Sequence, residues 1–105
     1  MDLRRHQRIP VRFQSALSDP NRAEWVGTVV NLSKGGCLIE TEAKVFAGMN
    51  VSLRFDIPGE TAPILVVRAA VRWGRKSLVG VGFLSMESPH QAHLDKVLER
   101  LKQTG

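Results

Sequence analysis

The sequence predicts a mainly all-β domain: a six-stranded antiparallel β-barrel followed by a C-terminal α-helix. Three observations lead to this fold class. Short segments of alternating apolar and polar residues follow one another over residues 9–85, turn residues separate them, and the apolar period lengthens to that of a helix after residue 88. The chain has 105 residues, which fits a single domain with one hydrophobic core.

The first three predicted strands follow a polar, basic arm over residues 1–8, which we expect to be flexible. Apolar and polar residues alternate over residues 11–17, until an Asp-Pro-Asn turn ends the first strand. Residues 24–31 are rich in Val, Thr and Trp, as strands are, and end at a glycine-rich turn. A third strand is expected over residues 37–41.

The other three strands are separated by turns at Pro58-Gly59 and at residues 74–77. The fourth strand places four apolar residues on one face: Val51, Leu53, Phe55 and Ile57. Alternation in the long fifth strand predicts Arg68 and Arg72 on one face and five apolar residues on the other: Leu65, Val67, Ala69, Val71 and Trp73. In the sixth strand Gly80 and Gly82 lie opposite an apolar face, where another element could approach closely.

The end of the chain predicts a helix over residues 88–102. Ser88 is a good N-cap, Pro89 suits the first helical position, and Gln91 completes a capping box. The apolar spacing is that of an amphipathic helix, carried by Leu94, Val97, Leu98 and Leu101. We expect this helix to cover an open end or edge of the barrel, because exposed strand edges invite aggregation.

Charge and cysteine content restrict the class of protein. Fifteen basic and ten acidic residues give a net charge of +5, which favours a nucleic acid, a nucleotide or an acidic membrane surface without choosing among them. The single cysteine, Cys37, excludes an intrachain disulfide and fits a reducing compartment. With no signal peptide and no apolar run long enough to span a bilayer, we expect a cytoplasmic protein.

The first candidate site is the arm, where Arg4, Arg5 and Arg8 are its three cations. It is either a solvated tail or an anion clamp. Arginine forms bidentate hydrogen bonds with phosphate oxygens and with the O6/N7 edge of guanine, and its plane stacks on bases. The choice of arginine over lysine at all three positions favours a planar anionic ligand.

The second candidate site is the turn Asn31-Leu32-Ser33-Lys34-Gly35-Gly36 at the end of a predicted strand. It is either a simple tight turn or a polar cup. In a cup, Asn31 and Ser33 lie on the same side of the strand end. Gly35 and Gly36 then leave room for a ligand near the backbone and expose amide donors.

The two motifs in this order, with a barrel pattern between them, resemble the PilZ domain family. The matching residues are Arg4, Arg8, Asn31, Ser33 and Gly36, and the likeness continues through the last hairpin and the closing helix. The resemblance implies a six-stranded barrel that binds the bacterial second messenger cyclic di-GMP. It implies that the arginine pair grips guanine and phosphate while Asn31 and Ser33 hold the opposite side, with Arg5 assisting.

A ligand sensor without enzymatic activity is therefore our leading hypothesis, with cyclic di-GMP as the ligand and no cofactor. The arm would fold over the ligand and pass the change of surface to a partner protein. The alternatives are a small basic barrel that binds single-stranded nucleic acid, and a PilZ-like adaptor without a ligand. No DNA binding is expected. The Asp and Glu residues are scattered and the sequence has no nucleophile elbow, so we expect no catalytic site.

Three further side chains have two interpretations each. His90 and His93 could face one metal, but we predict surface histidines because no acidic or cysteine partner is evident. Trp73 either stacks on a guanine or packs at the core or its rim. Cys37 we predict to be a small buried hydrophobe.

Overall fold

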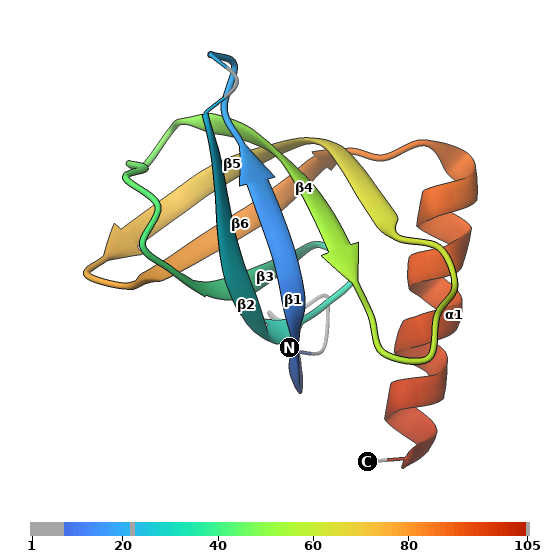
Figure 1. Cartoon of the computed structure of the whole chain (residues 1–105). Coiled ribbons are helices and arrows are strands. Elements are labelled where there is room, and N and C mark those ends of the chain that lie inside the picture. Colours follow the sequence, from blue (N-terminus) through green and yellow to red (C-terminus); the bar gives the residue numbers. More distant parts are fainter. Residues whose placement is uncertain (1–7, 22, 105) are drawn as a thin grey trace, which may run out of the picture.

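The computed structural model describes residues 8–21 and 23–104 and shows a closed barrel with one helix beside it (Figure 1). The strand order around the barrel is β1-β2-β3-β6-β5-β4, and all neighbours are antiparallel. The elements are β1 (Ile9–Ser18), β2 (Glu24–Leu32), β3 (Gly36–Thr41), β4 (Asn50–Asp56), β5 (Ile64–Arg75), β6 (Leu78–Ser85) and α1 (Ser88–Thr104). The predicted fold class is confirmed.

The core fills the barrel and follows the alternation expected for β4 and β6. All four apolar residues of the β4 face are buried, and Val79 and Val81 of β6 are buried opposite Gly80 and Gly82. Phe55 lies at the centre, with its ring edge-on to Phe13 at 5.6 Å. Such aromatic pairs add roughly 0.5–1.5 kcal/mol beyond the burial of their area.

The first half of β5 faces the opposite way from our prediction. Ile64 and Val66 are buried, whereas Leu65 and Val67 point outward. The cause is a bulge, because Leu53 pairs with Val66 and Val51 pairs with Ala69, so that β5 carries one extra residue. One inserted residue reverses the alternation of everything before it.

A second bulge in β5 moves Trp73 out of the predicted core face. Val71 pairs with Val81, but Trp73 pairs with the adjacent Gly80, so Arg72 is the extra residue. Arg72 and Trp73 are both exposed, with Trp73 at 39 %. Trp73 is therefore a surface side chain.

Helix α1 packs against the barrel through the predicted stripe. Leu94, Val97 and Leu98 are buried in the core cluster, and the helix contacts β1 and β5, the strands that flank β4. The predicted capping box is wrong: the first helical hydrogen bond runs from the Gln91 amide to the carbonyl of Glu87. The Gln91 side chain donates to Asp95 at 3.1 Å instead of turning back to the N-terminus.

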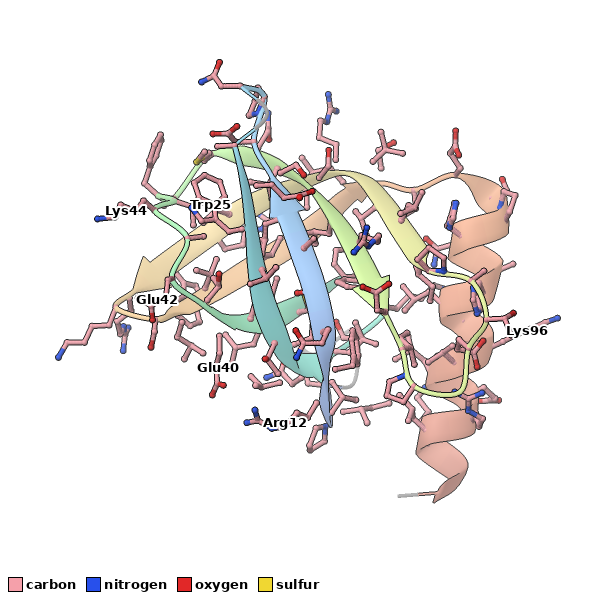
Figure 2. The ribbon with its side chains drawn as sticks, viewed as in Figure 1. Arg12, Trp25, Glu40, Glu42, Lys44 and Lys96 are labelled. Atoms are coloured by element: carbon pink, nitrogen blue, oxygen red, sulfur yellow. The ribbon has the colours of Figure 1, made fainter. Side chains whose placement is uncertain are left out.

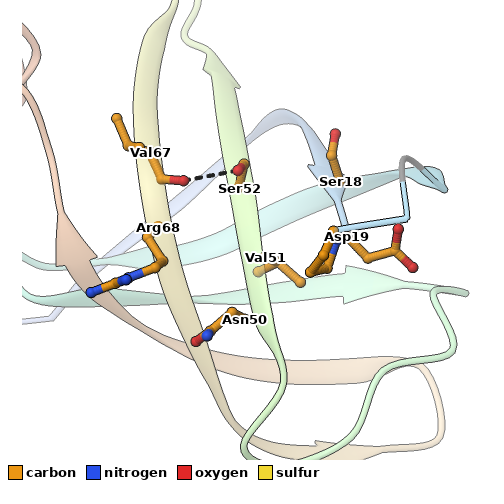
Figure 3. Close-up of a pocket in the computed structure, with 8 residues that line it drawn as sticks. Ser18, Asp19, Asn50, Val51, Ser52, Val67 and Arg68 are labelled. Carbon is orange, nitrogen blue, oxygen red and sulfur yellow. Dashed lines mark hydrogen bonds between the residues drawn. The ribbon is translucent and has the colours of Figure 1, made fainter.

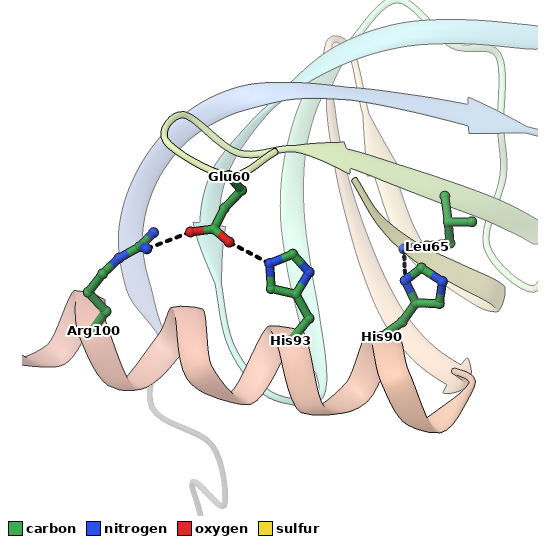
Figure 4. Close-up of polar contacts among 5 residues, drawn as sticks. All are labelled: Glu60, Leu65, His90, His93 and Arg100. Atoms are coloured by element: carbon green, nitrogen blue, oxygen red, sulfur yellow. Dashed lines mark hydrogen bonds and ion pairs between the residues drawn. The ribbon is translucent and has the colours of Figure 1, made fainter. Parts of the chain in front are cut away.

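Three hydrogen bonds join α1 to the start of β5 and the loop before it (Figure 4). His93 Nε2 lies 2.5 Å from one Glu60 carboxylate oxygen, and Arg100 donates to the other oxygen at 2.5 Å. The Leu65 amide donates to His90 Nδ1 at 3.1 Å. His93 thus has an acidic partner that the sequence did not reveal, because Glu60 is 33 residues away along the chain. Within residues 8–21 and 23–104 no cluster of three metal-ligating side chains occurs.

The contact between Glu60 and α1 makes the stability depend on pH. Hydrogen bonds from His93 and then Arg100 hold the pKa of Glu60 below its ordinary value. A carboxylate with a lowered folded-state pKa stabilises the fold above its unfolded pKa, and this stabilisation is lost as the pH falls through the folded-state pKa.

We therefore expect Glu60→Gln to lower the melting temperature by a few degrees at neutral pH. The difference from the parent protein should shrink as the pH is lowered below about 4, where the parent carboxylate becomes protonated. Thermal unfolding followed by circular dichroism at several pH values measures this. A difference that stays constant with pH would contradict the assignment.

Candidate ligand-binding face

The two sequence motifs meet on the barrel surface where β1 begins and β2 ends. The antiparallel register places Ile9 opposite Leu32 and Pro10 opposite Asn31. Arg8 precedes this pairing, and its Nη1 donates a hydrogen bond of 2.9 Å to the Asn31 side-chain oxygen. The contact joins residues 23 positions apart in sequence.

Of the predicted arm, the structure describes only Arg8; Arg4 and Arg5 lie outside the described residues. Arg8 is exposed, and its bond to Asn31 uses one of the five N–H donors of a guanidinium. The next arginine, Arg12, turns instead toward Glu40 of β3, with 3.5 Å between the charged atoms (Figure 2). Arg8 is thus the described arginine that meets the second motif.

Ser33 is enclosed in the turn and does not share a cup with Asn31. Its side chain is 3 % exposed, and its hydroxyl donates to the Gly36 carbonyl at 3.2 Å. The same oxygen accepts from the amides of Gly35 and Gly36 at 3.2 and 3.1 Å. The amide donors that we expected to be exposed are therefore bound to Ser33.

Gly36 is needed for close packing between strands. A Cβ at this position would collide with the Val81 carbonyl of β6, to which β3 is paired. The space that a side chain would occupy is thus filled by backbone in this structure. The Gly36 backbone is not left-handed, since the positive-φ residues among those described are Gly48, Gly59 and Lys76.

The side chains of β5 that approach the β6 glycines are Trp73, whose stacking on a guanine was one of two expectations, and Arg72, which the sequence did not single out. A Cβ on Gly80 would lie 2.5 Å from the Trp73 indole nitrogen, and one on Gly82 would lie 2.5 Å from Arg72 Nε. Because Gly82 pairs with Gly36, the Arg72 guanidinium lies over the strand next to the motif turn. The Gly-x-Gly pattern of β6 could have indicated that another element approaches closely there. Which side chains approach depends on the β5 bulge, and the pattern does not reveal it.

The neighbouring charges extend the cationic character of this face. Arg75 lies over the Trp73 ring at 5.6 Å, a cation–π distance.

Cys37 is fully buried, as predicted, and burial raises the pKa of its thiol well above the usual range, against the opposing charge of Arg8. The thiol is therefore neutral and enclosed.

Two surface hollows lie away from the motif residues. One of about 250 Å³ is formed by the end of β1 and by parts of β4 and β5, and one of about 330 Å³ lies between the loop after β3 and the β5–β6 hairpin. No helix in the part of the chain that the structure describes is long and apolar enough to cross a membrane.

Taken together, the fold and the site define a small β-barrel with an arginine-bearing outer face at the meeting point of two motifs. The chain belongs to the PilZ domain family, whose sequence profile matches residues 2–100. No curated protein matches the sequence significantly.

Solved structures share this fold at low sequence identity. The PilZ domain of CeSA from a cellulose-synthesizing bacterium is 16 % identical, with a TM-score of 0.73 over 91 % of this chain and 98 % of that one. The PilZ domain of YcgR from Escherichia coli, solved with c-di-GMP, is 15 % identical, with a TM-score of 0.77 over 98 % and 94 %. The K. pneumonia MrkH–c-di-GMP complex is 15 % identical, with a TM-score of 0.75 over 99 % of this chain and 54 % of that one.

We predict that Gly36→Ala destabilises the fold. The added methyl group would force β3 and β6 apart at Val81, and overpacking of this kind costs about 1–3 kcal/mol. Urea unfolding measures the change. Gly74→Ala is the matched control, because its Cβ would lie 3.4 Å from the nearest atom, the Val45 carbonyl oxygen. Equal stability of the two variants would refute the packing argument.

Ser33→Ala should also destabilise the protein, for a different reason. It removes the acceptor of the Gly35 and Gly36 amides, and an unsatisfied buried donor costs about 1–3 kcal/mol. The free energy of unfolding is again the measurement, and Ser33→Thr, which keeps the hydroxyl, is the control. A Ser33→Ala protein as stable as the parent would show that water replaces the hydroxyl.

Proposed function

We propose that this domain is a receptor for cyclic di-GMP that binds the ligand on the face around Arg8 and Asn31. The hydrogen bond between these two residues carries the proposal. It brings together the arginine motif and the Asn-x-Ser-x-x-Gly motif, both of which the PilZ resemblance assigns to ligand binding. Membership of the PilZ family supports the same assignment.

The chemistry of the ligand suits this face. Cyclic di-GMP carries two phosphodiester charges and two guanines, and arginine is the side chain that binds both kinds of group. We assign direct contact to Arg8 and Asn31, and to Arg4 and Arg5 of the arm. Ser33, Gly35 and Gly36 then hold the turn that positions Asn31, as their local hydrogen bonds suggest.

Trp73 and Arg72 offer a second contact region for the same ligand. Trp73 is exposed on the outer face, where its indole can stack on a purine, and Arg72 adds a cation over Gly82. The β6 glycines add no side chains of their own to this region. A ligand with two bases can contact both regions at once, whereas a mononucleotide has only one base to place.

The comparisons support a receptor role and no catalytic one. Two structural neighbours, YcgR and MrkH, were solved with c-di-GMP. At 15 % identity these likenesses support the fold, and the proposal of the ligand rests on the motif residues of this chain. We propose a cytoplasmic sensor whose arm closes over the ligand and whose altered surface then signals to a partner protein.

Isothermal titration calorimetry with cyclic di-GMP tests the proposal, beside GTP and a short single-stranded oligonucleotide. We expect saturable binding of cyclic di-GMP and weaker or no binding of the other two. The absence of binding at protein concentrations of tens of micromolar would refute the receptor function. Preference for the oligonucleotide would favour a nucleic-acid-binding barrel.

The matched variants of the same experiment are Arg8→Ala, Asn31→Ala and Arg54→Ala. Loss of the charged donor at Arg8 should weaken binding by about 1.5–3 kcal/mol, and loss of the neutral Asn31 amide by about 0.5–1.5 kcal/mol. Arg54 lies on β4 paired with Asp56, away from the motifs, so its replacement should leave affinity unchanged. Equal losses in all three variants would indicate a general charge effect.

A further inference from the structure

Three exposed aliphatic side chains gather on the outer face of β5 and β6. Leu65 is 40 % exposed, Val67 is 50 % and Leu84 is 48 %. Arg68 pairs with Ser85 and the next residue, Ala69, pairs with Phe83, so Leu84 is the extra residue that bulges beside them. The bulges therefore turn these apolar side chains to the surface together.

A surface hollow adjoins this cluster. It has a volume of about 250 Å³, and Val67 and Arg68 line one side while residues of β4 and of the β1–β2 turn, Asp19 among them, line the other (Figure 3). The Ser52 hydroxyl donates to the Val67 carbonyl at 2.8 Å, and this bond joins β4 to β5 at the hollow. Val67 thus belongs both to the apolar cluster and to the edge of the hollow.

Charges of both signs surround the cluster, because Asp19 lines the hollow and Asp56 lies beside Arg54, but the charged side chains without a described partner are arginines. Arg68 is exposed at the edge of the hollow, and its side chain makes no hydrogen bond or ion pair with any residue that the structure describes. Arg72 follows it four residues later along β5, with its guanidinium over Gly82. Arg54 on β4 is paired opposite Leu65 in the ladder and holds Asp56 at 3.3 Å. An apolar cluster beside Arg68 and Arg72, whose side chains form no ion pair with a described residue, fits a ligand that is both apolar and anionic.

We propose that this surface, formed by Leu65, Val67, Arg68 and Leu84 with the adjoining hollow, docks an extended acidic segment of a partner protein. The apolar side chains of the segment would cover the aliphatic cluster, and a carboxylate would pair with Arg68 in the hollow. The proposal goes beyond the receptor function and does not depend on it, since none of these four residues belongs to the motif face.

The chemistry favours this occupant over two others. Single-stranded nucleic acid binds through aromatic side chains that stack on bases, and the cluster is aliphatic. A symmetric contact with a second copy would bring Arg68 and Arg72 near their own counterparts, and like charges at an interface oppose association. An acidic segment has neither difficulty.

The experiment uses a short labelled peptide in which leucine and glutamate alternate. We expect saturable binding to the full chain by fluorescence anisotropy, and amide chemical-shift changes in ¹⁵N-labelled protein at residues 52, 65–68 and 84. Val67→Glu and Arg68→Glu should each weaken binding by at least about tenfold. Val26→Glu is the matched control, because Val26 is an exposed strand valine on β2, away from this surface, and it should bind as the parent does.

Four outcomes would overturn the proposal. They are absence of peptide binding at millimolar concentration, equally tight binding of a leucine–lysine peptide, shift changes confined to the motif face around Arg8, and equal loss in the Val26→Glu control. Sedimentation velocity and co-sedimentation with anionic vesicles, without peptide, detect a second copy or a lipid surface as the occupant. Dimerisation or vesicle binding that Val67→Glu abolishes would replace the acidic segment by that occupant.

Discussion

Closure of the barrel is the constraint on which the rest of the structure depends. β1 must pair with β2 along one edge and with β4 along the other, and six strands curve this tightly only if individual strands kink. Irregularities in the β1–β2, β2–β3, β4–β5 and β5–β6 ladders supply these kinks. Each bulge also reverses the alternation of its strand. The residues that close the barrel therefore also decide which side chains reach its surface.

This link explains how much of the fold could be predicted from the sequence. The buried face of β4 and the stripe of α1 follow unbroken periods, so their alternation was sufficient. In β5 the period breaks twice, and Leu65 and Trp73 were assigned to the wrong face. A bulge depends on which residues a strand pairs with, and those partners are distant in sequence. No local pattern carries that information.

The same limit applies to the candidate site. The resemblance identified Arg8 and Asn31, and their hydrogen bond shows that the two motifs are spatial neighbours. The sequence could not show whether the Ser33 hydroxyl bonds to the turn or faces a ligand, because both arrangements need the same residue types. Arg72 was missed because it is the inserted residue of a bulge. Glu60 was missed because it reaches His93 across the gap between a loop and a helix.

The hydrogen bond between Leu65 and His90 has a consequence for assembly. The last β6 partner of β5 is Ser85, opposite Arg68, so residues 64–67 have no neighbouring strand on that side. Unpaired backbone at a sheet edge is a template for strand addition from another chain. The imidazole of His90 accepts a hydrogen bond from one of these backbone donors, the Leu65 amide. The first turn of α1 therefore lies where an added strand would pair with β5. If α1 left the barrel, this edge of β5 would be exposed, and strands of other copies of the chain could add to it one after another.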